Sequence, residues 1–344
     1  MLSRSLLTQD IVLTNSQMDS PLSNAAQIIH QLVQDSFNGN RSGVAYGQKL
    51  LQASVPMLEL NTEQVNIGLL PGLICRANKA DPCQAVPVTA AWQLIRLAAK
   101  LLDDVEDGEV THQAAETINT AVSFLYLAQA SLWKLLEQGV TDRKVQRLHQ
   151  SLNQSVLQAC SGQHFDLAGK VNRVTMTPDV WLEIAAAKSG ALLAWTAWSG
   201  ALVAGVSGCT LTCYYDYGYH LGILLQVADD FNGVWSPTGN SDLAINSFTL
   251  PVCYTFSVIE EKNKQKLEHL LQKTSEGNAV AESQAKQTML EAGAQAYLLV
   301  VGRLHYRQAL AALQNTGVEK SGSELLTALL DNVWPAVNYS KNGQ

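Results

Sequence analysis

The sequence is poor in charged residues and in residues that interrupt helices. Only 15% of its 344 residues are charged, and it contains 23 glycines and 9 prolines. The formal net charge is −7 and no run of basic residues is present, so a protein that follows nucleic-acid phosphates through a basic surface is not expected. Scarce glycine and proline, together with short β-branched runs, favour helices over strands.

A hydrophobic run of membrane-spanning length is also lacking. The most apolar stretch, Ala191 to Val206, is shorter than the roughly 20 residues that cross a bilayer and contains a threonine and a serine. We expect it to be a buried core helix, and we expect no transmembrane segment. The N-terminal apolar stretch is broken by Gln9 and Asp10, unlike a signal peptide. Residues 1–22 are expected to form a mobile leader.

The six cysteines do not follow a metal-binding or disulfide pattern. Cys209 and Cys213 are four residues apart, but no histidine or second cysteine pair follows at the spacing of zinc ligands. We therefore interpret the cysteines as reduced, apolar-like residues of a cytoplasmic protein.

Apolar residues recur at helical spacing along most of the chain, and no strand pattern bounded by hairpin turns occurs. Thr177 and Pro178 have the form of a helix start, with threonine as the N-cap and proline in the first turn. The sequence predicts an all-α fold, a single large helical bundle formed by residues 23–344. The expected helices span about 24–36, 44–57, 86–107, 112–138, 142–169, 178–205, 207–234, 248–271, 282–313 and 322–333.

Carboxylates are concentrated at the end of one of these apolar helices, in the sequence LLDDVED. Asp103 and Asp107 are four residues apart and share a helix face, with Asp104 beside them. A second pair, Asp229 and Asp230, follows the apolar sequence LLQVA. Clustered carboxylates repel one another unless a cation lies among them. Hard carboxylate oxygens suit Mg²⁺, which completes its coordination shell with water and substrate phosphates.

The order of several motifs resembles that of the trans-prenyltransferases, or polyprenyl diphosphate synthases, which have the class I isoprenoid synthase fold. LLDDVED is similar to the first aspartate-rich motif of this family and LLQVADDFNG to the second. Between them, GQHFDL resembles the family's GQxxDL segment, and AAAKSG resembles the helix whose lysine contacts diphosphate. SDLAINSFTLP follows the outline of DLxxGKxTLP. The resemblance extends from about Gly68 to Tyr306.

This resemblance implies the mechanism and the residues that carry it. An allylic prenyl diphosphate would be the substrate, and about three Mg²⁺ ions would neutralise its diphosphate as it leaves. The implied metal ligands are Asp103, Asp104, Asp107, Asp229 and Asp230, and Lys188 is the implied diphosphate contact. Three further polar residues are interpreted either as contacts in the wall of the site or as polar core residues: Gln163, Asp166 and Gln226. The resulting carbocation would need an apolar, dry pocket.

The sequence departs from the family where isopentenyl diphosphate would bind. Leu69, Leu70 and Gly72 stand where a basic GKR-type segment is expected, and His112 and Gln113 replace an arginine pair. Two further positions differ from the family: Ser247 replaces a lysine, and Gly233 replaces the last aspartate of the second motif. The small residues Ala98 and Ala99 would form the pocket floor and leave it deep. Burying a diphosphate without cations is costly.

Several functions remain open on these grounds. The first is a Mg²⁺-dependent prenyltransferase whose acceptor need not be isopentenyl diphosphate. The second is a terpene synthase that cyclises farnesyl or geranylgeranyl diphosphate, and the third is a non-catalytic subunit of a heteromeric prenyl synthase. Ordinary chain elongation is a further alternative. The resemblance also implies a homodimer formed through the apolar helix Val122 to Leu136. Prenyl length, acceptor and product are not specified by the sequence.

Overall fold

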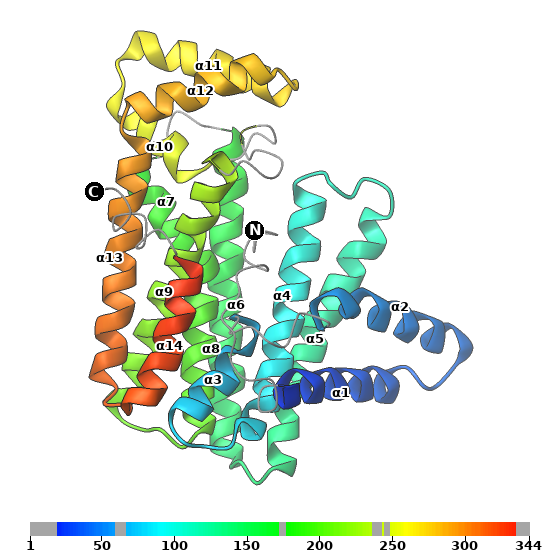
Figure 1. Ribbon diagram of the computed structural model, residues 1–344. Coiled ribbons are helices and arrows are strands. Elements are labelled where there is room, and N and C mark those ends of the chain that lie inside the picture. The colour runs from blue at the N-terminus through cyan, green and yellow to red at the C-terminus, as the bar shows by residue number, and fades with distance from the viewer. Residues whose placement is uncertain (1–18, 59–66, 172–176, 236–242, 244–247, 335–344) are drawn as a thin grey trace. The chain divides into compact units, whose positions relative to one another are not determined.

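The computed structural model describes residues 19–58, 67–171, 177–235, 243 and 248–334, and over these residues the chain is helical and contains no strand (Figure 1). The expected all-α fold is therefore confirmed. The α-helices are α1 (Asp19–Ser36), α2 (Arg41–Leu58), α3 (Leu70–Ala77), α4 (Val86–Glu106), α5 (Ala114–Glu137), α6 (Asp142–Val171), α7 (Pro178–Ala185), α8 (Ala191–Val203), α9 (Cys209–Trp235), α10 (Leu250–Val258), α11 (Glu261–Ser275), α12 (Ala279–Glu291), α13 (Ala294–Asn315) and α14 (Lys320–Val333). Shorter helical turns are η2 (Ile67–Leu69), η3 (Pro82–Ala85) and η5 (Ala186–Gly190).

Two of the long expected helices are each divided in the structure. The segment expected to be one helix over 248–271 breaks at Ile259, whose backbone is extended, so that α10 and α11 are separate. The segment expected over 282–313 breaks at Gly293, which has a φ of +84°, a left-handed conformation that glycine adopts without strain. Helix α3 was missed by the apolar periodicity. Helix α1 begins at Asp19, inside the expected leader, and residues 1–18 lie outside the described residues.

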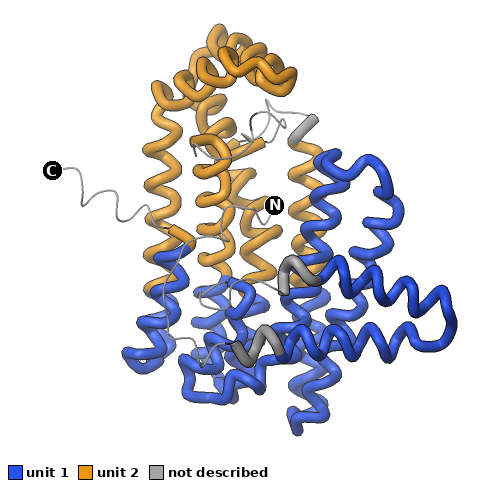
Figure 2. Tube along the Cα trace, turned by 45° about the vertical axis from the view of Figure 1, so that its right-hand side comes forward, with its two compact units in different colours: residues 1–153, 195–218, 311–332 blue, residues 154–194, 219–310, 333–344 orange. Residues whose placement is uncertain are grey.

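The chain forms two compact units that interleave in sequence (Figure 2). Unit 1 contains residues 1–153, 195–218 and 311–332, and unit 2 contains residues 154–194, 219–310 and 333–344. The unit boundaries fall inside helices α6, α8, α9, α13 and α14. The expectation of a single domain over 23–344 stays a prediction.

The core of unit 1 is built around α4. Every residue of α4 from Val86 to Ala98 is buried, as expected for a helix that is apolar on all sides. It packs against α5, α1 and α2. Helices α3 and α8 approach closely, because a side chain at Gly200 would come within 2.8 Å of the Pro71 backbone. The Cys75 thiol donates to the Gly200 carbonyl oxygen at 3.4 Å, so this cysteine is an apolar-like core residue.

One helical segment, Pro82–Glu106, passes a length and composition test for a membrane-spanning helix. This segment includes α4, and 78% of its most apolar stretch is buried inside the protein. Burial in the core of unit 1 accounts for its apolar composition.

In unit 2, the start of α7 confirms the helix signal read from the sequence. The Thr177 hydroxyl accepts a hydrogen bond from the Val180 backbone N–H at 3.3 Å, and Pro178 is the first helical residue. Helix α7 packs against α10, while α11 and α12 form an antiparallel pair (Figure 1). The backbone of α9 lies against η5, because a side chain at Gly222 would come within 2.3 Å of the Ser189 carbonyl oxygen.

Candidate active site

The first group of candidate site residues lies at the C-terminal end of α4, in unit 1. Asp103, Asp104 and Asp107 are half-buried, and the Asp107 N–H caps the helix by donating to the Asp103 carbonyl oxygen at 2.8 Å. The Lys100 ammonium group contacts both oxygens of the Asp104 carboxylate, at 2.9 and 3.0 Å. One aspartate of the group is therefore paired with a cation from the preceding turn of the same helix.

These carboxylates lie at the end of the helix where the helix dipole disfavours negative charge. The C-terminal end of a helix carries a partial negative charge from the aligned peptide dipoles, which disfavours acidic side chains in the last turn. The last turn of α4 and its cap nevertheless carry four acidic residues, from Asp103 to Asp107, with Lys100 as the nearby ammonium. This arrangement favours the binding of additional positive charge.

The second acidic pair lies on α9, in unit 2, and its members differ. Asp229 is buried, with 6% of its surface exposed. The Asp230 carboxylate accepts a hydrogen bond from the Leu250 backbone N–H at 2.5 Å, at the first residue of α10. Thr249, which precedes Leu250, makes no side-chain capping bond. Asp230 thus caps α10 from another helix, a structural role that the sequence did not indicate.

Lys188 and Asp166, also in unit 2, are brought together as an ion pair. The Lys188 ammonium donates to the Asp166 carboxylate at 2.6 Å, and both side chains are mostly buried. Lys188 lies in η5, a π-helical turn between α7 and α8. Gly162 on α6 lets this turn approach, because a side chain there would come within 2.9 Å of Lys188 Cγ. The GQHFDL and AAAKSG segments are therefore direct neighbours.

The other expected site residues occupy positions that suit a wall or a floor. Gln226 is buried on α9, one turn before the acidic pair, and Gln163 is half-buried on α6 beside the glycine that faces η5. Ala98 is fully buried and Ala99 half-buried on α4, one turn before Asp103. The locations of Gln163 and Gln226 are compatible with both interpretations, a contact in the wall of the site and a polar core residue, and the pocket-floor role of Ala98 and Ala99 stays a prediction.

The positions expected to bind isopentenyl diphosphate have no basic side chains to offer. Leu69, Leu70 and Gly72 are buried in η2 and α3. His112 is exposed, and Gln113 is the residue before α5, with a left-handed φ of 76°. The position of Ser247 lies outside the described residues.

A buried arginine was missed by the sequence analysis. Arg96, on α4, is 5% exposed, and burial lowers its pKa to about 10. Its guanidinium donates to Gln93 Oε1 at 3.1 Å and lies 5.9 Å from the centre of the Trp92 ring, and Gln93 in turn donates to the Gly68 carbonyl oxygen. Arg96 precedes Asp103 by two helical turns and so shares its face. A lone arginine within the apolar run AAWQLIRLAAKLL was the signal that could have identified it.

Three tryptophans lie on helices α4 and α8. Trp92 and Trp195 are core residues whose indole N–H groups donate to the carbonyl oxygens of Ile67 and Leu148. Trp198 lies beneath the Arg147 guanidinium, 5.4 Å from its ring centre.

The donor set fits Mg²⁺ by its chemistry. Carboxylate oxygens are the ligands that this ion prefers; Asp103 and Asp107 offer them at the end of α4, and Asp229 offers them separately on α9. Over the residues that the structure describes, no three His, Cys, Asp or Glu side chains form a preassembled metal cluster. A site of this kind would depend on ligand oxygens from the substrate and water.

Comparison with known proteins agrees with this chemistry. The sequence model of one family, described as polyprenyl synthetase, matches residues 68–289. The chain is 34% identical over 188 residues to a geranylgeranyl diphosphate synthase of Mycobacterium tuberculosis, a match that covers 50% of this chain and 52% of that protein. It is 26% identical over 302 residues to a short chain isoprenyl diphosphate synthase of Methanothermobacter thermautotrophicus, covering 83% and 90% of the two chains.

A further relative is named as one part of an assembly. The chain is 29% identical over 198 residues to heptaprenyl diphosphate synthase component 2 of Geobacillus stearothermophilus, covering 54% of this chain and 60% of the relative. Among solved structures, a polyprenyl synthetase from Streptomyces coelicolor has a TM-score of 0.76 at 21% identity, covering 92% of this chain and 98% of that one. This likeness supports the all-α isoprenoid synthase fold.

Proposed function

Because the chain belongs to the polyprenyl synthetase family, we propose that it is a Mg²⁺-dependent prenyltransferase that ionises an allylic prenyl diphosphate. The observation that carries this proposal is the accumulation of carboxylates at the C-terminal end of α4, where the helix dipole disfavours them. The proposed metal ligands are Asp103 and Asp107 at the end of α4 and Asp229 on α9. When bound, Mg²⁺ would neutralise the negative charge that develops on the departing diphosphate.

The chain's own residues contribute a positioned cation. The Lys188 ammonium is fixed by its ion pair with Asp166 and by the close approach of Gly162. A pre-oriented cation stabilises charge that grows in the transition state more than charge already present in the ground state. Donation from Lys188 to a leaving diphosphate oxygen would therefore accelerate ionisation. The apolar, buried face of α4 that includes Ala98 would shield the allylic cation from water.

The acceptor is the open part of this proposal. Leu69, Leu70 and Gly72 are buried and offer no charge, which favours an acceptor other than isopentenyl diphosphate or a cyclisation without one. The relatives are named as prenyl diphosphate synthases, one of them as a component of a larger enzyme.

One experiment separates these outcomes. The full chain is incubated with Mg²⁺ and geranyl, farnesyl or geranylgeranyl diphosphate, with and without isopentenyl diphosphate, and the products are identified by mass spectrometry. We expect donor consumption that requires Mg²⁺. Longer diphosphates formed only with isopentenyl diphosphate would establish elongation, and hydrocarbons or alcohols formed without it would establish a terpene synthase. No donor consumption, even with a supplied partner component, would refute catalysis and favour a non-catalytic subunit.

We further propose that α5 forms a homodimer interface. Exposed apolar side chains recur along this helix: Ile118, Val122, Tyr126, Trp133 and Leu136. Tyr126 is 74% exposed and Trp133 50% exposed, which is unusual for large apolar residues that follow one another along a helix. A second copy of the chain would cover this stripe in a two-fold arrangement.

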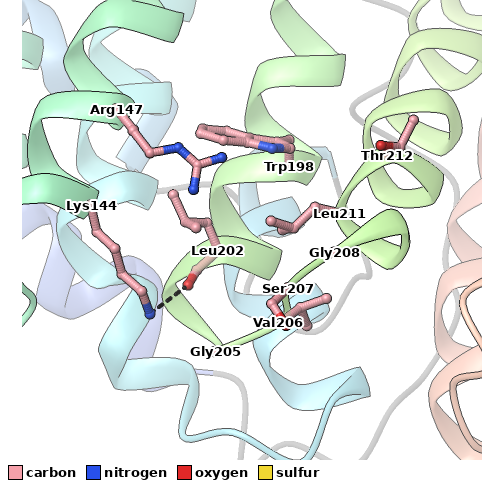
Figure 3. A pocket seen from close by; sticks show the side chains of 10 residues that line it. All are labelled: Lys144, Arg147, Trp198, Leu202, Gly205, Val206, Ser207, Gly208, Leu211 and Thr212. Carbon is pink, nitrogen blue, oxygen red and sulfur yellow. Dashed lines mark hydrogen bonds between the residues drawn. The ribbon is translucent and has the colours of Figure 1, made fainter.

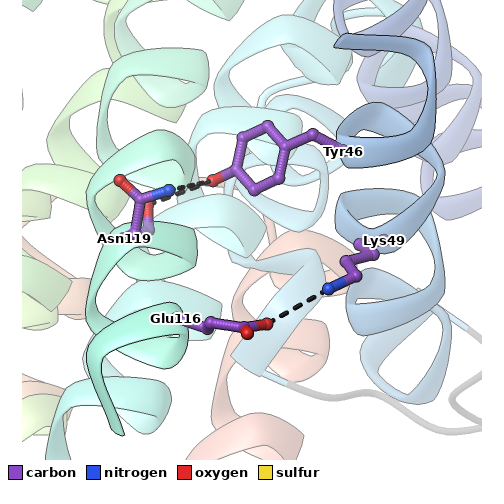
Figure 4. Close-up of polar contacts among 4 residues, drawn as sticks. All are labelled: Tyr46, Lys49, Glu116 and Asn119. Carbon is purple, nitrogen blue, oxygen red and sulfur yellow. Dashed lines mark hydrogen bonds and ion pairs between the residues drawn. The ribbon is translucent and has the colours of Figure 1, made fainter. Parts of the chain in front are cut away.

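Polar contacts hold the start of α5 against α2, so that the helix carrying these exposed apolar side chains is fixed in position. The Lys49 ammonium lies 3.1 Å from the Glu116 carboxylate, and the Tyr46 hydroxyl receives a hydrogen bond from the Asn119 amide at 3.1 Å (Figure 4). Sedimentation equilibrium tests the interface. We expect Tyr126→Glu to convert a dimer into a monomer, whereas Val300→Glu, an equally exposed apolar position on α13, leaves the mass unchanged. A monomeric wild-type chain would refute the proposal.

A further inference from the structure

A positively charged pocket lies in unit 1, and neither acidic group belongs to it. It has a volume of about 360 Å³, within the range of small-molecule sites. The lining residues come from the first turns of α6, from the end of α8 and from the start of α9: Lys144, Arg147, Trp198, Leu202, Gly205, Val206, Ser207, Gly208, Leu211 and Thr212 (Figure 3). Two of these ten residues are cations and none is acidic, in a chain whose net charge is −7.

The Arg147 guanidinium is held in position but is not neutralised. It lies over the Trp198 indole, 5.4 Å from the ring centre, a cation–π contact that orients the planar group (Figure 3). Among the described residues, no hydrogen bond or ion pair engages its N–H groups. A guanidinium fixed in this way is suited to bidentate hydrogen bonding with phosphate oxygens.

Lys144 adds a second donor on the same side of the pocket. Its ammonium donates to the Leu202 carbonyl oxygen at 3.5 Å, a long contact at the C-terminal end of α8 (Figure 3). An ammonium group has three N–H donors, so two are left for another acceptor. No carboxylate within the described part of the chain forms an ion pair with it.

The loop between α8 and α9 completes the pocket with small and polar groups. Gly205 and Gly208 have φ values of +85° and +64°, and a side chain at either would meet nothing within 4 Å. Ser207 and Thr212 carry hydroxyl groups at the rim. The first backbone N–H groups of the long helix α9 lie beside them and add partial positive charge.

We propose that this pocket binds the phosphate or diphosphate group of an organic phosphate ester, whose apolar part lies against Leu202 and Leu211. Arg147 and Lys144 supply the charge-assisted hydrogen bonds, and Trp198 keeps the guanidinium in place. The proposal is independent of prenyl transfer, because none of these residues belongs to the acidic groups or to the Lys188 ion pair. The ester is either a free metabolite or the headgroup of an anionic lipid, which share the same phosphate chemistry.

Calorimetry with the full chain tests the free form of the ligand. Inorganic diphosphate is titrated in the presence of EDTA, so that metal-dependent binding at the aspartates does not contribute. We expect Arg147→Met, which keeps a side chain over Trp198 but removes the charge, to weaken binding at least about tenfold. Arg143→Met is the matched control, because Arg143 is exposed on the same helix and does not line the pocket. Its affinity should stay within about twofold of wild type.

Flotation with phosphatidylcholine vesicles, with and without phosphatidylglycerol, tests the lipid form. Binding to the anionic vesicles alone, lost in Arg147→Met and kept in Arg143→Met, would support the pocket and identify a headgroup as the ligand. Equal losses in both variants would overturn the proposal, because they would reflect diffuse attraction to the start of α6. Absence of binding in both assays would overturn it as well. Lys144→Met provides the same comparison if Arg147→Met does not fold.

Discussion

Helices α4 and α9 both end an apolar run with the dipeptide Asp-Asp, but they satisfy the second aspartate in different ways. Asp104 is paired with Lys100, one turn earlier on its own helix. Asp230 accepts the backbone N–H of Leu250 and so begins a different helix. The second aspartate of the dipeptide is therefore stabilised by a neighbour on its own helix in unit 1, and by a contact with a residue distant in sequence in unit 2.

The two helices also differ in the polar groups that they bury. α4 buries Arg96, a cation that stays charged at neutral pH even though burial lowers its pKa to about 10. α9 carries His220, whose Nδ1 atom lies 3.1 Å from Nδ1 of His305 on α13. Burial, and secondarily His220, lowers the pKa of His305 to about 4, so this histidine is neutral at pH 7. The buried charge of Arg96 on α4 thus contrasts with the neutral His305, which packs against α9.

The largest expected effect concerns Asp103, the first aspartate of α4. Asp103→Ala should reduce donor turnover about a thousandfold, because it removes a metal ligand that stabilises the leaving diphosphate. The free energy of unfolding should change little, since the side chain is half-buried and lies at a helix end. Turnover by mass spectrometry and urea unfolding in EDTA provide the two measurements.

Glu109→Ala is the matched control for Asp103→Ala. Glu109 is exposed and lies just beyond the end of α4, so its removal lowers the local negative charge by the same amount. Turnover in this variant should equal that of the wild type. Full activity in Asp103→Ala would contradict the assignment of Asp103 as a metal ligand. The acidic groups of α4 and α9 would then differ in their structural contacts alone.

Much of the fold follows from local sequence signals. Apolar periodicity predicts most of the helices, and Thr177 with Pro178 marks the start of α7 as the structure has it. The breaks at Ile259 and Gly293 were not predicted, because the apolar pattern continues through both positions and tertiary packing decides where the chain turns. Within the site, motif order relates Lys188 to Asp166, and the structure shows the contact.

Other parts of the site depend on contacts between residues far apart in sequence. The cap that Asp230 provides joins residues twenty positions apart, across a stretch that carries no helix signal. The pair of His220 and His305 joins positions separated by 85 residues. Arg96 reads as one isolated charge in an apolar run, and only packing shows that it is buried on the face of Asp103. The Asp230 cap and the histidine contact are therefore defined by tertiary structure, with no local pattern to reveal them.

The next prediction concerns His305, the buried neutral group that contrasts with the buried charge of Arg96. His305 has a folded-state pKa of about 4, below its ordinary value of 6.5, so the unfolded chain binds the proton more tightly between these two values. Stability from this group is fully present above pH 6.5 and is lost as the pH falls towards 4. The loss is at most about 3 kcal/mol.

Urea unfolding from pH 7 to pH 4.5 measures this loss. His305→Gln keeps a hydrogen-bonding partner for His220 but does not titrate, so its stability should fall less steeply with acidification than that of the wild type. His269→Gln is the control, because His269 is exposed on α11 and its replacement should leave the slope unchanged. Parallel curves for wild type and His305→Gln would mean that folding does not lower the pKa of His305.

The smallest expected effect tests the comparison of the two dipeptides directly. Asp230→Ala removes the cap of α10 and should lower the free energy of unfolding by about 1 kcal/mol, whereas Asp230→Asn keeps an acceptor and should lower it by only a few tenths. Asp104→Ala removes a partly exposed ion pair, with Lys100 40% exposed, and should cost about 0.3–0.5 kcal/mol. Urea unfolding in EDTA excludes any metal contribution.

Equal losses in Asp230→Ala and Asp104→Ala would mean that the tertiary cap is worth no more than the local pair. Lost turnover in a stable Asp230→Asn would show instead that the carboxylate charge serves the metal site, since the amide preserves the cap.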